Sequence, residues 1–146
     1  MNIFKALICL DYYRLRMQHR TRETGSGGVH KIGFAWICNT LTLIGGYLIY
    51  FKLYNQSEVV YDTLSALHYY ALAGRVILLV LLSIIYLLAF TIYGNKQTIH
   101  STLKTFIRLE SWEQDRIATN ATRYFTLSWV LFLIVACITL YLYKFQ

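Results

Sequence analysis

The sequence contains no proline, few charged residues and no cysteine motif. Without proline, no helix loses a backbone donor at an interior position, so straight helices are expected. Only 14% of the 146 residues are charged and 57% are hydrophobic, whereas a soluble domain has about 25% charged residues. The three cysteines are scattered, which argues against a disulfide framework or a cysteine-based metal site. These shortages exclude a disordered chain, a coiled coil and an ordinary soluble domain.

Three stretches without charge, at residues 33–51, 76–95 and 124–143, are long enough to cross a bilayer. A hydrocarbon core of about 30 Å requires about 20 helical residues. Backbone groups in hydrocarbon must be satisfied within their own segment, so each stretch is expected to be a helix. The sequence therefore predicts an all-α membrane protein with transmembrane helices at residues 33–53, 71–93 and 124–143, and an outer loop at residues 54–70 that includes a short interfacial helix.

The cations are distributed unevenly about these spans. Three of them lie in or beside the predicted outer segments: Lys52, Arg75 and Lys144. Eleven lie before the first span or between the second and third: Lys5, Arg14, Arg16, Arg20, Arg22, Lys31, Lys96, Lys104, Arg108, Arg116 and Arg123. The positive-inside rule then places the N-terminus in the cytoplasm and the C-terminus outside. A bacterial inner membrane is the expected location, because no targeting segment is recognisable.

Residues 1–32 are predicted to form a basic amphipathic helix followed by a glycine-rich hinge. From Asn2 to Arg20, apolar residues recur at helical spacing. Such a helix lies in the membrane interface, where its cations approach anionic lipids; docking to a partner is the alternative. The hinge at residues 21–28 lacks a phosphate-loop pattern. The residues expected to contact lipid headgroups are Lys5, Arg14, Arg16 and Arg20.

The connector at residues 94–123 is the second element expected on the cytoplasmic side. Apolar residues keep rough helical spacing from Ile99 to Ile117, which predicts an amphipathic helix, either separate or continuous with a neighbouring span. The connector also holds three of the seven acids of the chain. A solvated connector is the simpler interpretation. If the segment binds a partner, the candidate contacts are Phe106, Glu110, Trp112 and Glu113.

The first span carries a stripe of small and polar residues. Its members are Ala35, Asn39, Thr42 and Gly46, which share one helix face. Small residues let helices approach closely, and an asparagine in hydrocarbon needs a partner. The stripe therefore predicts a helix–helix contact, inside the bundle or between subunits. A pore lining is the alternative, although no ring-forming charge accompanies the stripe.

No catalytic constellation is recognisable. None of the four histidines lies in the middle of a span, so no haem or other cofactor is expected, and no zinc-binding pattern occurs. The acids Glu110, Glu113 and Asp115 are the candidates for a lipid-modifying enzyme. Three spans after an amphipathic helix resemble the layout of small membrane-integral lipid kinases, which hold magnesium with carboxylates at the cytoplasmic interface. The first two spans here contain no acid, so the resemblance covers architecture only.

The sequence therefore favours a non-catalytic small subunit or accessory factor of a larger membrane complex. Its expected partners are anionic membrane lipids and other membrane subunits; a homo-oligomer is also open, and no nucleic-acid partner is expected. The principal alternative is a homo-oligomeric channel or pore. Further alternatives are a small lipid-modifying enzyme and a toxin-immunity protein of the membrane.

Overall fold

The computed structural model describes residues 1–17, 26–54 and 71–144. Within these ranges the chain forms helices and no strand, which confirms the predicted all-helical fold. The predicted outer-loop helix, most of the hinge and Arg20 lie outside the described residues. The helices are α1 (Ile3–Met17), α2 (Ser26–Leu53), α4 (Ala71–Tyr93), α5 (Lys96–Ile107) and α6 (Ser111–Lys144).

Three of these helices are long and apolar enough to cross a membrane, over Gly27–Leu53, Arg75–Tyr93 and Ser111–Leu142. At about 1.5 Å per residue, even the shortest helix of the three, α4, matches a hydrocarbon core of about 30 Å. Most of their large apolar side chains are exposed, as suits a surface that faces lipid instead of water. The prediction of three membrane-spanning helices is confirmed by the length and the composition of these helices.

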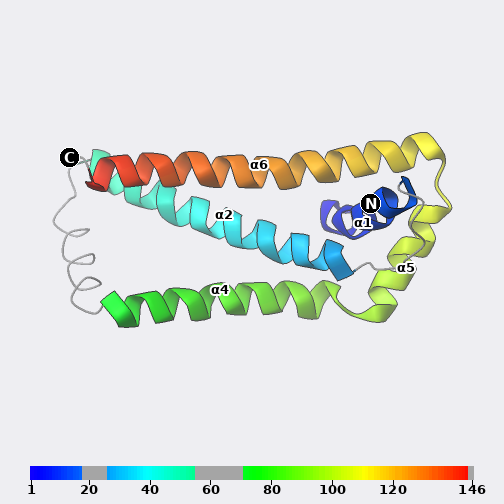
Figure 1. The fold of residues 1–146 in the computed structure, drawn as a ribbon, viewed down its shortest axis with the longest axis horizontal. Coiled ribbons are helices and arrows are strands. Elements are labelled where there is room, and N and C mark those ends of the chain that lie inside the picture. The colour runs from blue at the N-terminus through cyan, green and yellow to red at the C-terminus, as the bar shows by residue number, and fades with distance from the viewer. Residues whose placement is uncertain (18–25, 55–70, 145–146) are drawn as a thin grey trace.

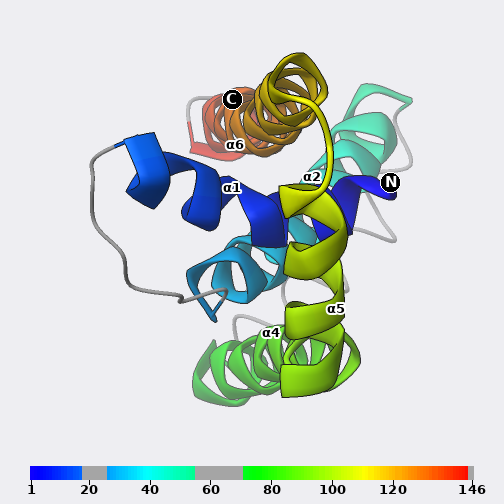
Figure 2. The ribbon, with the colours of Figure 1, turned by 90° about the vertical axis from the view of Figure 1, so that its right-hand side faces the viewer.

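The long helices do not form a parallel bundle. Helix α2 runs diagonally, so that its beginning lies beside the end of α4 and its end lies beside the end of α6 (Figure 1). Helices α1 and α5 gather at one end of the molecule, where α5 lies across the axes of α4 and α6 (Figure 2). The molecule thus has a crowded end, formed around α1 and α5, and an open end.

Two short turns set α5 across the bundle. Gly94 and Asn95 separate α4 from α5, and the Asn95 side chain caps α5 by accepting a hydrogen bond from the Gln97 amide at 3.0 Å. After α5, the Gln114 side chain donates to the Leu109 carbonyl at 2.9 Å and bridges the turn into α6. The connector predicted at residues 94–123 is therefore one separate helix followed by an extension of the last span.

Helix α1 lies at the centre of the buried core. Five consecutive residues are each at most 3% exposed: Ala6, Leu7, Ile8, Cys9 and Leu10. Successive helical residues point about 100° apart, so this half of α1 is covered on every side. Its neighbours include Val29 and Ile32 of α2 and Ala118 and Ala121 of α6. The expected interfacial helix, with one apolar face, does not describe these five residues. The residues of α1 before them, Ile3 to Lys5, and those after them, Asp11 to Arg14, are partly or fully exposed.

Glycines of α2 mark its crossings with three other helices. A Cβ atom at Gly28 would lie 2.4 Å from the Ile8 Cα atom of α1, which leaves no room for a side chain. The same atom at Gly33 would lie 2.7 Å from the Tyr86 ring of α4, and at Gly45 it would lie 2.5 Å from Val135 of α6. At Gly46 it would meet nothing within 4 Å.

We expect Gly28→Ala to destabilise the fold, because the added methyl group meets the α1 backbone rather than a movable side chain. Overpacking of this kind costs about 1–3 kcal/mol. Gly46→Ala is the matched control, since it places the same change in open space on the same helix, where replacing glycine gains about 0.5–1 kcal/mol. Thermal unfolding in detergent measures both. Equal effects of the two substitutions would contradict the close approach of α1 to α2.

We also expect Cys9 to resist maleimide labelling in the folded protein. Burial raises the pKa of the Cys9 thiol to about 12, so neither access nor thiolate is available at pH 8. The test uses a variant with Cys9 as its single cysteine, and a control in which the exposed Ser101 of α5 carries the single cysteine instead. Labelling is followed by mass spectrometry before and after denaturation. Rapid labelling of native Cys9 would show that α1 lies at the surface.

Candidate functional site

The crowded end collects most of the charged side chains that the structure describes. The cations carried there by α1, α5 and the adjoining ends of α2 and α6 are Lys5, Arg14, Lys31, Lys96, Lys104, Arg108 and Arg116. The open end has Lys52 and Arg75. Asp11, Glu110, Glu113 and Asp115 also lie at the crowded end, so polar chemistry in the described part of the chain is concentrated in one layer.

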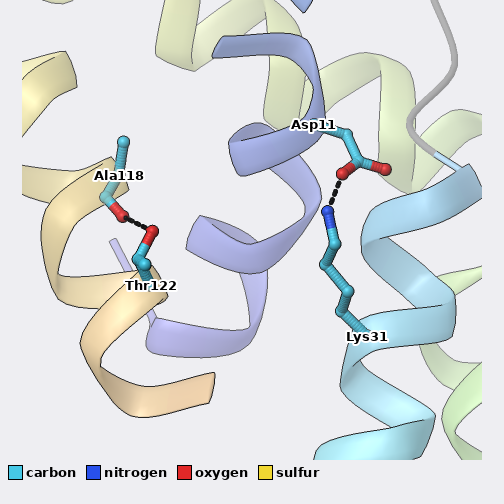
Figure 3. Close-up of polar contacts among 4 residues, drawn as sticks. All are labelled: Asp11, Lys31, Ala118 and Thr122. Carbon is cyan, nitrogen blue, oxygen red and sulfur yellow. Dashed lines mark hydrogen bonds and ion pairs between the residues drawn. The ribbon is translucent and has the colours of Figure 1, made fainter. Parts of the chain in front are cut away.

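An ion pair joins α1 to the beginning of α2. Lys31 Nζ donates to Asp11 Oδ1, and the two side chains are 24% and 17% exposed (Figure 3). Asp11 is the only acid of α1, and Lys31 lies between two buried apolar residues of α2, Val29 and Ile32. On the other side of α1, Thr122 of α6 bonds back to the Ala118 carbonyl, so its hydroxyl needs no partner from α1. Figure 3 shows α1 lying between α6 and α2.

A second polar bond ties α1 to α6. The Tyr13 hydroxyl donates to Asp115 Oδ1 at 3.0 Å. The bond and the nearby carboxylate raise the pKa of the Tyr13 hydroxyl above its ordinary value, because both favour the protonated phenol. Helix α1 is therefore held by carboxylate bonds on both sides, to α2 through its own Asp11 and to α6 through Asp115.

His30 holds α4 to the beginning of α2. A hydrogen bond joins His30 Nδ1 to the Tyr86 hydroxyl, and the two rings are stacked with their centroids 6.0 Å apart. Phe90 lies on the same imidazole, with centroids 5.7 Å apart. Adjacent residues of α2 thus bind two different helices: His30 binds α4, and Lys31 binds α1.

The predicted stripe of α2 is divided between the interior and the surface. Ala35 is fully buried, and the Asn39 amide donates to the Tyr124 hydroxyl of α6 at 3.0 Å. Thr42 bonds back to the Cys38 carbonyl at 2.8 Å, and Gly46 faces open space. The structure therefore places Ala35 and Asn39 in contacts inside the chain. The glycine at the α6 crossing is the neighbouring Gly45.

The acids proposed for catalysis have separate surroundings. Glu110 accepts a hydrogen bond from Trp112 Nε1 at 2.5 Å, Asp115 accepts from Tyr13, and Glu113 lines a groove beside α5. No group of three or more histidine, cysteine or acidic residues that could hold a metal ion occurs among the described residues.

The predicted partner surface of the connector is also divided. Phe106 is fully buried in a cluster with Cys9 and Leu103, and is therefore part of the core between α1 and α5. Trp112 remains 57% exposed, with the Arg116 guanidinium 5.5 Å from its ring centroid. Only the start of α6 keeps an exposed contact surface. The burial of Phe106 depends on α1, and helical spacing within the connector could not reveal it.

The structure describes the side chains of two of the four residues that are predicted to contact lipid headgroups. Lys5 and Arg14 are exposed at the crowded end. Nothing is described for the side chain of Arg16 or for Arg20. Lys5 lines a groove of about 570 Å³, with Glu113, Arg116 and Asn120 of α6 and several hydroxyl side chains of α5.

A smaller groove on the other side of α5 was missed by sequence reasoning. It measures about 310 Å³ and is lined by Tyr12, His100, Leu103, Lys104, Ile107 and Arg108. Three of these residues are basic and lie four residues apart along α5, a spacing that places them on one helix face. The sequence shows this four-residue repeat of basic residues directly, whereas the position of Tyr12 opposite the repeat depends on the packing of α1.

No protein-family model, no curated protein and no solved structure matches the chain.

We expect Asp11→Asn and Lys31→Gln each to lower the free energy of unfolding by about 1–3 kcal/mol, because each leaves a half-buried charged group without its partner. The double variant should lower the free energy of unfolding by less than the sum of the two single losses. Chemical unfolding in detergent, read by tryptophan fluorescence, measures all four proteins. Strictly additive losses would show that the pair does not join α1 to α2.

Proposed function

We propose that the chain is a non-catalytic subunit of a larger membrane assembly, and that it meets its neighbour through α4. The observation that carries the proposal is the exposure of the first part of this helix. Every residue from Arg75 to Leu81 is exposed. This stretch exceeds one helical turn of about 3.6 residues, so no side of it is covered by the described part of the chain.

The diagonal course of α2 supports this proposal. The contacts of α4 with α2 involve the second half of α4, through Tyr86 and Phe90, and Ala89 is its one fully buried residue among those described. Its first half diverges from α2 toward the open end (Figure 1). A helix held at one end has little restraint on its tilt at the other, and a neighbouring transmembrane helix would supply that restraint.

The polar residues of α4 suit a contact within the membrane. Ser83 bonds back to the Leu79 carbonyl at 2.7 Å, and Thr91 bonds back to the Leu87 carbonyl at 2.9 Å. Both hydroxyl groups are therefore satisfied without water. The face presented by α4 is apolar, as the packing surface of a membrane subunit should be.

The separate surroundings of the acids give little support to a lipid-modifying enzyme. A channel also gains little support. The predicted pore face has one side-chain amide, that of Asn39, and this amide already donates a hydrogen bond to Tyr124 inside the chain. A subunit role requires neither a cluster of acids nor a free amide on that face.

We expect the tagged protein, purified from its native membrane in mild detergent, to carry another integral membrane protein in fixed ratio. A benzophenone amino acid in place of Leu79 of α4, which is 63% exposed, should form a crosslink to that protein. The same group in place of Leu140 of α6, which is 64% exposed, is the matched control and should crosslink far less. Mass determination of the crosslinked species identifies the neighbour.

Three results would contradict this proposal. Equal crosslinking from both positions would remove the assignment to α4. Crosslinks to lipid alone, with no protein in fixed ratio, would remove the subunit role. Crosslinks only to a second copy of the chain would replace it with a homo-oligomer.

A further inference from the structure

The smaller groove beside α5 has the chemistry of an anionic lipid site. Its basic side chains are His100, Lys104 and Arg108, all exposed. Neither Lys104 nor Arg108 takes part in an ion pair among the described residues, where the pair formed is Lys31–Asp11. Like charges four residues apart on a helix repel each other. An anion between Lys104 and Arg108 would turn this repulsion into attraction.

The rest of the groove is apolar. Leu103 and Ile107 line it from α5, and Tyr12 lines it from α1. Ile107 is 46% exposed although it stands beside two cations. A soluble phosphate would gain nothing from these side chains, whereas an acyl chain would remove them from water. The groove therefore combines a charged rim with an apolar lining, which matches the two parts of a phospholipid.

The position of α5 fits the same ligand. It lies across the ends of α4 and α6 (Figure 2), so it runs along the membrane surface if those helices cross the bilayer. The groove would then open at the depth of the headgroups. Its volume of about 310 Å³ is at the lower end of the range for ligand pockets. This volume suits a headgroup phosphate and the start of an acyl chain rather than a whole lipid.

The larger groove on the other side of α5 lacks this selectivity. Lys5 and Arg116 are accompanied there by the carboxylate of Glu113, and its other lining residues include several hydroxyl and amide side chains. A carboxylate in the lining opposes an anion. The basic face of α5 has no acid among its lining residues.

We propose that the groove formed by Tyr12, His100, Leu103, Lys104, Ile107 and Arg108 binds one anionic phospholipid, with its phosphate between Lys104 and Arg108. Arg108 offers a planar set of donors that fits two phosphate oxygens, and Lys104 adds a second charge. His100 lies one turn further along the same face. The site does not depend on the protein partner proposed above, and it is tested on the purified chain alone.

The experiment measures lipid binding to the full chain by native mass spectrometry in detergent, with phosphatidylglycerol and phosphatidylcholine as probes. We expect one phosphatidylglycerol to bind in preference to phosphatidylcholine. The double variant K104Q/R108Q should weaken its binding about thirtyfold, because each cation near an anionic lipid contributes a factor of about five. The control K96Q/R123Q removes the same charge from two other exposed cations of α5 and α6 and should change binding less than twofold.

A further variant separates a lipid from a free anion. Ile107→Gln should weaken the binding of phosphatidylglycerol and leave the binding of glycerophosphate unchanged, because glycerophosphate has no acyl chain. Circular dichroism confirms that each variant is folded. Equal losses in K104Q/R108Q and in its control would overturn the proposal, since they would reflect general surface charge. Glycerophosphate that competes as well as the lipid would overturn it in favour of a phosphate site. Unchanged binding of phosphatidylglycerol to K104Q/R108Q would also overturn it.

Discussion

The close approach of α1 to the beginning of α2 is the constraint on which the rest of the structure depends. Because Gly28 has no side chain, the α2 backbone lies directly against Ile8, and α1 can be enclosed between α2 and α6. Once α1 occupies this position, its far side supports Leu103 and Phe106 of α5. The place of α5 across the end of the bundle, and the grooves on either side of it, follow from that packing.

The two ends of the molecule differ in the kind of interaction that joins the helices. At the crowded end, His30, Lys31 and Tyr13 make directional bonds to three different helices. Toward the open end, α2 meets α6 through Gly45 and Val135, and α4 is left apart. Directional bonds fix the relative positions of helices more strictly than apolar contact does. The crowded end therefore sets the geometry of the chain, and the open end offers surface to its surroundings.

The spans were predictable because hydrocarbon imposes a length and a composition that a sequence states directly. The enclosure of α1 was harder to predict, although the run from Ala6 to Leu10 contains no polar residue and could have indicated it. Helical spacing identifies an apolar face and does not reveal whether the opposite face is covered as well. The choice between Gly45 and Gly46 depends on the crossing of two helices, which no local pattern encodes. The bond between Asp11 and Lys31 was hidden for the same reason, because it joins two helices.

The burial of α1 also orders the steps by which the chain matures. Tyr13 and its partner Asp115 are 102 positions apart, and the alanines that cover α1 belong to α6, which is synthesised well after α1. Helix α1 is thus synthesised well before part of its environment exists. Until α6 is in place, a nearly continuous apolar run has no permanent neighbour, and it must wait in the lipid surface or against a chaperone. The packing of the crowded end is therefore completed only with α6, and a chain truncated before α6 cannot enclose α1.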